Sequence, residues 1–257
     1  MSARAPAPPL CAVLIGAAGR MGRAIFKVAG EFPGLAFVGA LASGDSALLG
    51  RDSGSLAGGA PNHLPITSDL GAALARAQVV IDFSTALATR ENLRACRAAH
   101  KPLLLGTTGF AADLEAELAA AAAEIPLLVA PNTSLAVTLL GELARRAAQA
   151  LPGFAIGITE THHRDKRDAP SGTALALAAA IREARPGQIP ISSVREGEVV
   201  GEHCVHFAGP GEELALTHRA LAREVFARGA LAAALWLSSQ APGRYDMRDV
   251  MGFKTAT

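Results

Sequence analysis

The sequence predicts an α/β protein whose first part is a Rossmann-type, doubly wound parallel sheet, followed by a second α+β domain with an open mixed sheet. Three observations support this prediction. Strand-like and helical segments alternate in the first half, strand-like segments cluster in the second half, and a glycine-rich loop follows the first strand. Repeated β-α-β order forms a parallel sheet with helices on both faces, and ligands bind such sheets at the carboxyl ends of the strands.

Short apolar runs separated by alanine-rich helical patterns make up the first half of the chain. Runs that are apolar throughout are typical of strands buried on both faces of a parallel sheet. The predicted strands are Cys11 to Ile15, Ala36 to Leu41, Val79 to Asp82, Leu103 to Leu105 and Leu127 to Val129. The predicted helices are Met21 to Val28, Asp69 to Ala75, Thr89 to Ala99 and Asp113 to Ala123.

The pattern changes after about residue 133. Here strand-like runs follow one another without helices between them, which indicates an open mixed or antiparallel sheet. The predicted helices are Leu135 to Ala150, one that starts near Ser171, and Arg223 to Leu237. The predicted strands are Phe154 to Glu160 and three alternating runs around Ile189 to Arg195, Val199 to Phe207 and Glu213 to His218.

Composition excludes several classes of partner. The formal net charge is +1, with 18% charged residues and no long run of like charges, so neither nucleic acid nor an anionic membrane is an expected partner. The most apolar windows fall well short of the roughly 18 residues of a membrane span, and the Pro- and Ala-rich opening, Ser2 to Pro9, does not read as a signal peptide. Three widely spaced cysteines fit reduced thiols, and we expect a cytoplasmic protein.

The glycine-rich loop reads GAAGRMG from Gly16 to Gly22, directly after the first strand and at the start of a helix. Glycines let the backbone turn sharply and approach a pyrophosphate, whose charge is met by N–H groups at the helix start. The spacing G-x-x-G-x-x-G is one residue longer than the common fingerprint. The alternative is a tight turn without a ligand, but the position between strand and helix favours dinucleotide binding.

In such domains an acidic residue about 20 residues after the glycine-rich loop usually hydrogen-bonds the ribose of the coenzyme, and this residue is missing here. The second strand ends at Ala42 and Ser43, and the nearest acid is Asp45. Arg20, inside the loop, could face a 2′-phosphate, or it could be an ordinary solvated side chain at a helix start. The sequence therefore leaves the choice between NADH and NADPH open.

Two further polar segments follow predicted strands, GTTG from Gly106 to Gly109 and APNT from Ala130 to Thr133. Such segments supply close backbone approach and small hydrogen-bonding groups, which the carboxamide of a nicotinamide could use. When each segment is considered alone, a turn that binds no ligand explains its composition equally well.

The densest ionisable stretch runs from Glu160 to Asp168 and reads ETHHRDKRD. A histidine can donate a proton near neutral pH, and a nearby lysine can hold a carboxylate. Pro170 is expected at the first position of the following helix, where the N–H groups of 171–173 would form an anion site. The alternative is a solvated charged loop. A metal site built from His162, His163, His203, His206 and His218 is disfavoured, because adjacent histidines point different ways and no closed-site spacing supports it.

Taken together, these motifs resemble the 4-hydroxy-tetrahydrodipicolinate reductase family. The segments that carry the resemblance are GAAGRMG at 16–22, GTTG at 106–109, APN at 130–132, ETHHRDKRDAPSGTA at 160–174, GEHCVHF at 201–207 and YDMRDV at 245–250. They stand in the family's order and at similar spacing, and the likeness covers nearly the whole chain after the first ten residues. The histidine-rich segment is the most specific.

The resemblance implies a domain layout. It implies a dinucleotide-binding domain over residues 1–132, completed by residues 241–257, a substrate-binding and oligomerisation domain over residues 133–240, and a homotetramer. It also implies a small dicarboxylate substrate, reduced by NADPH or NADH.

The resemblance also implies roles for residues. His162 is the proton donor, Lys166 assists it, and His163, Gly172 and Thr173 bind the carboxylates of the substrate. The implied coenzyme contacts are Gly16, Ala17, Ala18, Gly19, Arg20, Met21, Gly106, Thr107, Thr108, Ala130, Pro131, Asn132 and Thr133.

This sequence departs from the family pattern at two places. Many members have an acid followed by an arginine where Ala42 and Ser43 stand, and a phenylalanine where Thr133 stands. The rivals are another two-domain reductase, such as an aspartate or homoserine dehydrogenase, and a non-catalytic nicotinamide sensor. The substrate that the resemblance implies is a conjugated cyclic imine dicarboxylate. Coenzyme oxidation that depends on adding this cyclic imine would discriminate against both rivals.

Overall fold

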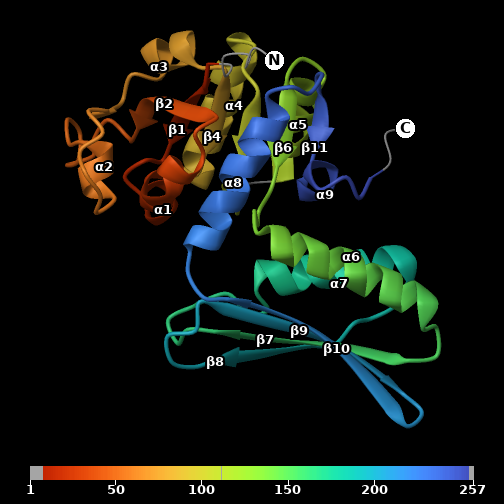
Figure 1. Ribbon diagram of the computed structural model, residues 1–257. Helices are drawn as coiled ribbons and strands as arrows, with labels where there is room; N and C mark the ends of the chain where they lie inside the picture. Colours follow the sequence, from red (N-terminus) through yellow and green to blue (C-terminus); the bar gives the residue numbers. More distant parts are fainter. Residues whose placement is uncertain (1–7, 111, 255–257) are drawn as a thin grey trace, which may run out of the picture. The chain divides into compact units, whose positions relative to one another are not determined.

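The computed structural model describes residues 8–110 and 112–254. The opening segment Ser2 to Pro9, which was not expected to be a signal peptide, lies almost wholly outside the described residues. The chain forms two compact units, residues 1–133 with 226–257, and residues 134–225. Figure 1 shows that the last long helix, α8 (Glu224–Leu237), runs beside the strands of the first unit. The sequence prediction had assigned that helix to the second domain.

The first unit contains a seven-stranded sheet in which every neighbouring pair is parallel. The strand order is β3-β2-β1-β4-β5-β6-β11. The strands are β1 Leu10–Ile15, β2 Leu35–Leu41, β3 Ile66–Thr67, β4 Val79–Asp82, β5 Leu103–Leu105, β6 Pro126–Val129 and β11 Gly243–Tyr245. The chain order reverses between β1 and β4, and in sheets of this kind ligands bind beyond the carboxyl ends of the strands at such a reversal.

Helices cover both faces of this sheet. Helices α1 and α8 pack on one face, whereas α3, α4 and α5 pack on the other. The helices are α1 Arg20–Val28, α2 Ser53–Leu56, α3 Leu70–Arg76, α4 Ala86–Ala98, α5 Glu115–Ala122 and α9 Met247–Val250, with 3-10 turns at Ala29–Glu31 and Ala112–Leu114. No helix in the described parts of either unit is long and apolar enough to cross a bilayer.

The predicted architecture of the first unit is confirmed, and all five predicted strands lie within one residue of the observed ones. The C-terminal strand β11 pairs with β6 and completes the sheet, as the resemblance implied. The elements that the sequence pattern did not reveal are β3, β11, α2 and α9. Their two to four residues establish no hydrophobic period, and none of them is a continuous apolar run like those that predicted β4, β5 and β6.

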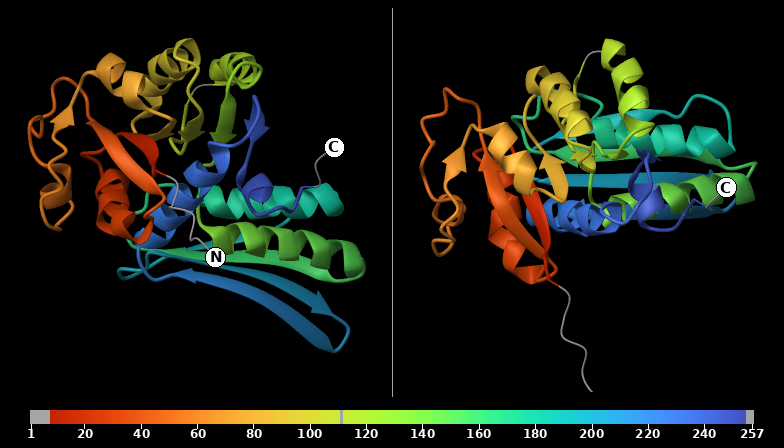
Figure 2. Two further views of the ribbon diagram at one scale, coloured as in Figure 1. Left: turned by 45° about the horizontal axis from the view of Figure 1, so that its top comes forward. Right: turned by 90° about the horizontal axis from the view of Figure 1, so that it is seen from above.

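The second unit is a four-stranded mixed sheet with two helices on one face (Figure 2). Its elements are α6 Leu135–Ala150, β7 Ala155–His162, α7 Gly172–Ala184, β8 Ile191–Arg195, β9 Gly201–Gly209 and β10 Glu212–Ala220. The strand order is β10-β9-β7-β8, in which only the β7–β8 pair is parallel. Ile158, Leu177 and Phe207 lie in the core between the helices and the sheet.

The start of α7 differs from the prediction. Pro170 is not the first helical residue, because Ser171 is the N-cap and Gly172 begins the helix. The hydroxyl of Ser171 accepts a hydrogen bond from the N–H of Ala174 at 3.2 Å. The serine side chain thus pairs with one of the N–H groups that have no intrahelical partner at a helix start, which a proline side chain cannot do. Strand β7 also runs two residues further than predicted, to His162, because its pairing with β8 continues to Arg195.

Candidate active site

The turn between β1 and α1 requires two of its glycines. Gly16 has φ +84°, and a Cβ atom there would lie 2.4 Å from the carbonyl oxygen of Phe83. A Cβ atom at Gly22 would lie 2.4 Å from the carbonyl oxygen of Gly16. These distances are far shorter than any real contact, so the loop can fold back on α1 and against the end of β4 only because both side chains are absent.

The N-terminus of α1 has no side-chain cap. Its N-cap residue is Gly19, whereas the starts of α4, α6 and α7 are capped by the side chains of Thr85, Ser134 and Ser171. The first turn of a helix has N–H groups without intrahelical partners and carries partial positive charge. An uncapped start beside a glycine turn is therefore suited to bind the pyrophosphate of a dinucleotide.

A cavity of about 530 Å³ lies at the carboxyl ends of β1, β2 and β4. Three of the predicted coenzyme residues, Gly16, Ala18 and Gly19, line it. The other lining residues are Ile15, Leu41, Ala42, Ser43, Gly44, Ser46, Ser68, Leu70, Phe83, Ser84, Thr85, Ala88, Glu91 and Asn92. The volume is typical of a small-molecule site, and the position at the strand reversal is the one that dinucleotides use.

Sequence reasoning missed the contribution of the β4 end to this cavity. Asp82 is fully buried, and its carboxylate accepts hydrogen bonds from the N–H of Ser84 at 2.7 Å and from Asn92 Nδ2 at 2.9 Å. Burial raises the pKa of Asp82, and these hydrogen bonds oppose the effect. Asp82 thus fixes two residues that line the cavity. The available signal was the pair Ser84 and Thr85, which begins two residues after the end of a predicted strand.

The remaining predicted coenzyme residues lie in the first unit but do not line this cavity. Arg20 is exposed at the first position of α1, and Met21 follows it. Gly106, Thr107 and Thr108 follow β5, and Ala130, Pro131, Asn132 and Thr133 follow β6. The hydroxyl of Thr133 donates to the carbonyl oxygen of Phe226 at 2.7 Å, so this side chain holds the start of α8.

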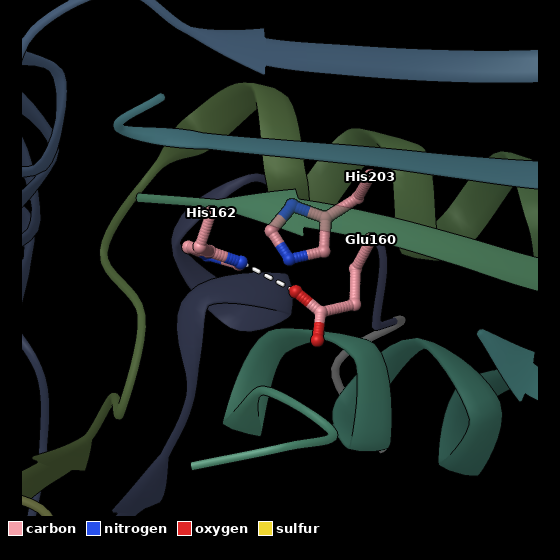
Figure 3. A group of neighbouring side chains, drawn as sticks. All are labelled: Glu160, His162 and His203. Carbon is pink, nitrogen blue, oxygen red and sulfur yellow. Dashed lines mark hydrogen bonds and ion pairs between the residues drawn. The ribbon is translucent and has the colours of Figure 1, made fainter. Parts of the chain in front are cut away.

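His162 is the last residue of β7 and is buried on the helix-covered face of its sheet. Alternate residues of a strand share a face, so Glu160 points to the same side. The Nδ1 atom of His162 is hydrogen-bonded to Oε2 of Glu160 (Figure 3). His163 lies beyond the strand and is partly exposed. The structure thus places the two adjacent histidines in different environments.

Glu160 is fully buried, and both of its carboxylate oxygens have partners. Oε1 accepts hydrogen bonds from Nη2 of Arg195 at 2.7 Å and from the N–H of Ser171 at 3.3 Å, while Oε2 contacts His162. Burial alone would raise the pKa of Glu160, but hydrogen bonds from Arg195, Ser193 and His162 together outweigh it and hold the pKa at about 2. Glu160 is therefore ionised at neutral pH.

His203, on β9, packs edge-on against the His162 ring, with ring centroids 5.1 Å apart and an angle of 75° between the planes. Its Nε2 atom lies 3.2 Å from the hydroxyl of Ser171. Burial lowers the pKa of His203 to about 4, and the neighbouring His162 acts in the same direction. Burial also lowers the pKa of His162, although Glu160 opposes this effect. His203 is thus a neutral neighbour of His162.

The predicted carboxylate-binding residues surround the start of α7. Nζ of Lys166 donates to Oδ1 of Asp168 at 2.8 Å, and Gly172 is exposed, with open space where a Cβ atom would stand. Thr173 follows it in the first turn. The N–H of Ser171 is not available to a substrate as predicted, because it points to Glu160. The anion site at this helix start therefore begins at Gly172.

Glu160, His162 and His203 each offer one possible metal-ligand atom, and these atoms lie within 4.8 Å of one another. The Oε2 atom of Glu160 contacts Nδ1 of His162 directly, and Arg195 already balances the carboxylate charge. A divalent ion needs room for bonds of about 2 Å to each ligand, which a direct hydrogen bond does not leave. The arrangement suits proton transfer better than metal binding.

Comparisons with known proteins cover nearly the whole chain. Residues 11–133 match the family model described as dihydrodipicolinate reductase, N-terminus, and residues 136–251 match the model of its C-terminus. The chain is 44% identical to the 4-hydroxy-tetrahydrodipicolinate reductase of Anaeromyxobacter dehalogenans strain 2CP-1, over 94% of this chain and 97% of that one. It is 45% identical to the reductase of the same name from Alkalilimnicola ehrlichii, over 93% and 97%.

Among solved structures, the chain is similar to a dipicolinate-bound dihydrodipicolinate reductase from Paenisporosarcina sp. TG-14. The TM-score is 0.78 and the sequence identity is 25%, over 93% of this chain and 97% of that chain. The similarity therefore includes both units and is not confined to the nucleotide-binding fold.

Proposed function

The chain belongs to the dihydrodipicolinate reductase family, and on that basis we propose that the residues around His162 perform the family's reaction. In this reaction 4-hydroxy-tetrahydrodipicolinate loses water and gains one hydride and one proton, which gives tetrahydrodipicolinate for lysine and diaminopimelate biosynthesis. The reduced nicotinamide coenzyme supplies the hydride when it is bound. The single observation that carries the residue assignment is the buried hydrogen bond between His162 and Glu160.

In our proposal His162 is the general acid. Hydride addition to a conjugated cyclic imine leaves electron density on the ring, and a positioned imidazole can quench it with a proton. His162 is held from Nδ1 by Glu160, which leaves Nε2 as the atom that delivers the proton. His163 lies outside the strand and outside this hydrogen-bond network, so we assign it to substrate binding.

We assign the carboxylates of the substrate to Lys166, His163 and the start of α7 at Gly172 and Thr173. A helix start stabilises an anion, and the exposed backbone at Gly172 allows close approach. The solved relative binds dipicolinate, a planar dicarboxylate, which supports a dicarboxylate site in this chain as well. Asp168 pairs with Lys166 in the structure, and a bound carboxylate would compete with it.

The coenzyme would be held by the loop from Gly16 to Met21 and by the segments after β4, β5 and β6. The uncapped start of α1 and the cavity beside it fit a pyrophosphate and an adjoining nucleoside. Ala42 and Ser43 line the cavity where an acid or an arginine would read the ribose. We therefore propose that both NADH and NADPH are used.

We also propose that the protein is a cytoplasmic homotetramer. Within the described residues of the second unit, both helices cover the same face of the sheet, and the strand register places alternate residues such as Thr159, Cys204 and Ala215 on the opposite face. An uncovered sheet face of this kind is suited to association between copies. Light scattering coupled to gel filtration tests the assembly, and a monomeric mass would refute it.

The decisive experiment measures coenzyme oxidation with and without the cyclic imine. We expect oxidation only when the imine is present, and inhibition by dipicolinate that competes with the imine. Oxidation that instead follows aspartate semialdehyde would indicate one of the rival dehydrogenases. Tight coenzyme binding without any turnover of the imine would indicate a sensor, and either result would overturn the proposed function.

A further inference from the structure

Glu160 connects the proton donor to the start of α7, and the residue roles assigned above use only its contact with His162. Its Oε2 contacts His162, and its Oε1 accepts from the N–H of Ser171, the residue immediately before the proposed carboxylate site. We propose that Glu160, clamped by Arg195, is the positioning residue that fixes the tautomer and orientation of His162 and couples this proton donor to the substrate-binding helix start. The inference rests on the proposed role of His162 as the acid.

Arg195 holds the carboxylate of Glu160 in place. Its Nη2 atom donates to Oε1 of Glu160 at 2.7 Å and to the carbonyl oxygen of Asp168 at 2.7 Å. A single guanidinium nitrogen thus holds both the buried carboxylate and the polar segment that carries Lys166 and Asp168. Arg195 stands opposite His162 in the β7–β8 register, so sheet pairing places it there. The side chains of Glu160 and Arg195 are 0% and 18% exposed, so solvent screens this pair weakly.

The hydrogen bond to Glu160 determines which nitrogen of His162 can deliver a proton. An ionised carboxylate only accepts hydrogen bonds, so Nδ1 of His162 must carry the proton and donate it. Nε2 is then the atom that takes up and delivers the catalytic proton. A Cβ atom at Gly201 would lie 3.0 Å from Nε2, so the glycine on β9 leaves the ring edge the room it needs.

The charged and titratable groups that face His162 come from four segments. Glu160 is on its own strand, Arg195 is on β8, His203 is on β9, and Lys166 is in the loop after β7. Burial lowers the pKa of His162, Lys166 and Arg195 act in the same direction, and Glu160 raises it. Removal of the Glu160 charge should therefore lower the pKa of His162 further and leave less of the protonated acid at neutral pH.

The chain offers a matched control for the loss of a buried carboxylate. The side chain of Glu142 on α6 is 3% exposed and pairs with Arg145 at 2.7 Å, in the same unit and outside the groups that face His162. Glu142→Gln and Glu160→Gln each remove one buried negative charge beside an arginine. Any loss of activity that comes only from reduced stability should appear in both variants.

The experiment compares Glu160→Gln, Glu142→Gln and His162→Gln in the full-length protein, with kcat, KM and the pH profile of kcat as readouts. For Glu160→Gln we expect kcat to fall about ten- to a hundredfold, the typical range for a lost hydrogen bond to a charged group. The pH above which kcat declines should move down by about one unit, and coenzyme affinity should stay unchanged. Arg195→Lys, which keeps the charge but loses the planar fork, should show a smaller shift in the same direction.

A second measurement needs no variant of Glu160. In wild-type protein labelled with 15N-histidine, the neutral form of His162 should be protonated on Nδ1, and its signal is assigned by its loss in His162→Gln. Protonation on Nε2 instead would overturn the inference, as would a Glu160→Gln variant that matches Glu142→Gln in kcat and pH profile. If His162→Gln itself kept wild-type kcat, the proposed acid would be wrong, and that failure is distinct from the other two.

Discussion

The glycine turn of the first unit and the histidine site of the second unit are built by different means. The turn depends on absent side chains, because Cβ atoms at Gly16 and Gly22 would overlap the backbone. The histidine site depends on buried charges, because Glu160 is held between Arg195 and His162. Steric substitutions should therefore affect coenzyme binding in the first unit, whereas substitutions that change charge should affect chemistry in the second.

The largest expected effect is on chemistry alone. His162→Gln should lower kcat by about a hundred- to ten-thousandfold, the usual value of a positioned proton donor, and leave coenzyme affinity near wild type. His163→Gln should act mainly through the KM of the imine. Steady-state kinetics combined with coenzyme titration measure both. The reverse pattern, in which His163→Gln loses kcat and His162→Gln loses only binding, would mean that the acid is misassigned.

A steric change in the glycine turn should affect coenzyme binding and stability. Gly22→Ala places a Cβ atom 2.4 Å from the carbonyl oxygen of Gly16, so we expect coenzyme binding to fail and unfolding stability to drop by about 3 kcal/mol. Gly30→Ala, where a Cβ atom would meet nothing within 4 Å, is the control. Calorimetry and coenzyme fluorescence provide the readouts. Equal behaviour of the two alanine variants would show that the turn tolerates a side chain.

Two buried groups, His203 in the second unit and Asp82 in the first, should respond to acid with opposite signs. Burial lowers the pKa of His203 from 6.5 to about 4, so the unfolded chain takes up a proton below pH 6.5 before the folded chain does, and stability falls as the pH decreases. Burial raises the pKa of Asp82, so the contribution of Asp82 alone to stability increases as the pH falls. When the pH is lowered from 6.5 to 4.5, the free energy of unfolding of His203→Asn should decrease by about 2 kcal/mol less than that of the wild type. Equal losses in urea titrations at the two pH values would contradict this prediction.

A smaller effect is expected at the start of α7. Gly172 is exposed and a Cβ atom there would meet open space, so Gly172→Val should fold normally but block a carboxylate from the helix start. We expect the KM of the imine to rise about ten- to a hundredfold, or roughly 1.4 to 2.7 kcal/mol, with coenzyme affinity little changed. A parallel loss of coenzyme binding would show that the two sites are not independent.

The smallest effect concerns the choice of coenzyme. The described residues that line the cavity include one acid, Glu91, and no lysine or arginine, and Ala42 and Ser43 stand at the end of β2. Discrimination between NADH and NADPH should therefore stay below about a hundredfold, or about 2.7 kcal/mol, with any tilt toward NADPH caused by Arg20. The ratio of kcat/KM for the two coenzymes measures it. A larger ratio would mean that another residue reads the 2′-phosphate.

The local pattern of apolar and polar residues was sufficient to predict most of the fold. The alternation of apolar runs and helices predicted the parallel sheet, and the glycine spacing predicted the turn after β1. The period of two in β7 places Glu160 and His162 on one face, so this pairing could have been inferred from the sequence. The start of α7 was misplaced because a proline signal and a serine cap compete within two residues, and only the hydrogen bond to Ala174 decides between them.

The order of the elements, the two unit types and the family motifs could be predicted from the sequence, because these depend on neighbours along the chain. The groups that surround His162 could be identified only from the folded protein. Arg195 and His203 lie 33 and 41 residues further along the chain, and the pairing of β7 with β8 and β9 brings them to the same face. The pairing of strands this far apart depends on the packing of whole strands against α6 and α7, so neighbours along the chain do not reveal it.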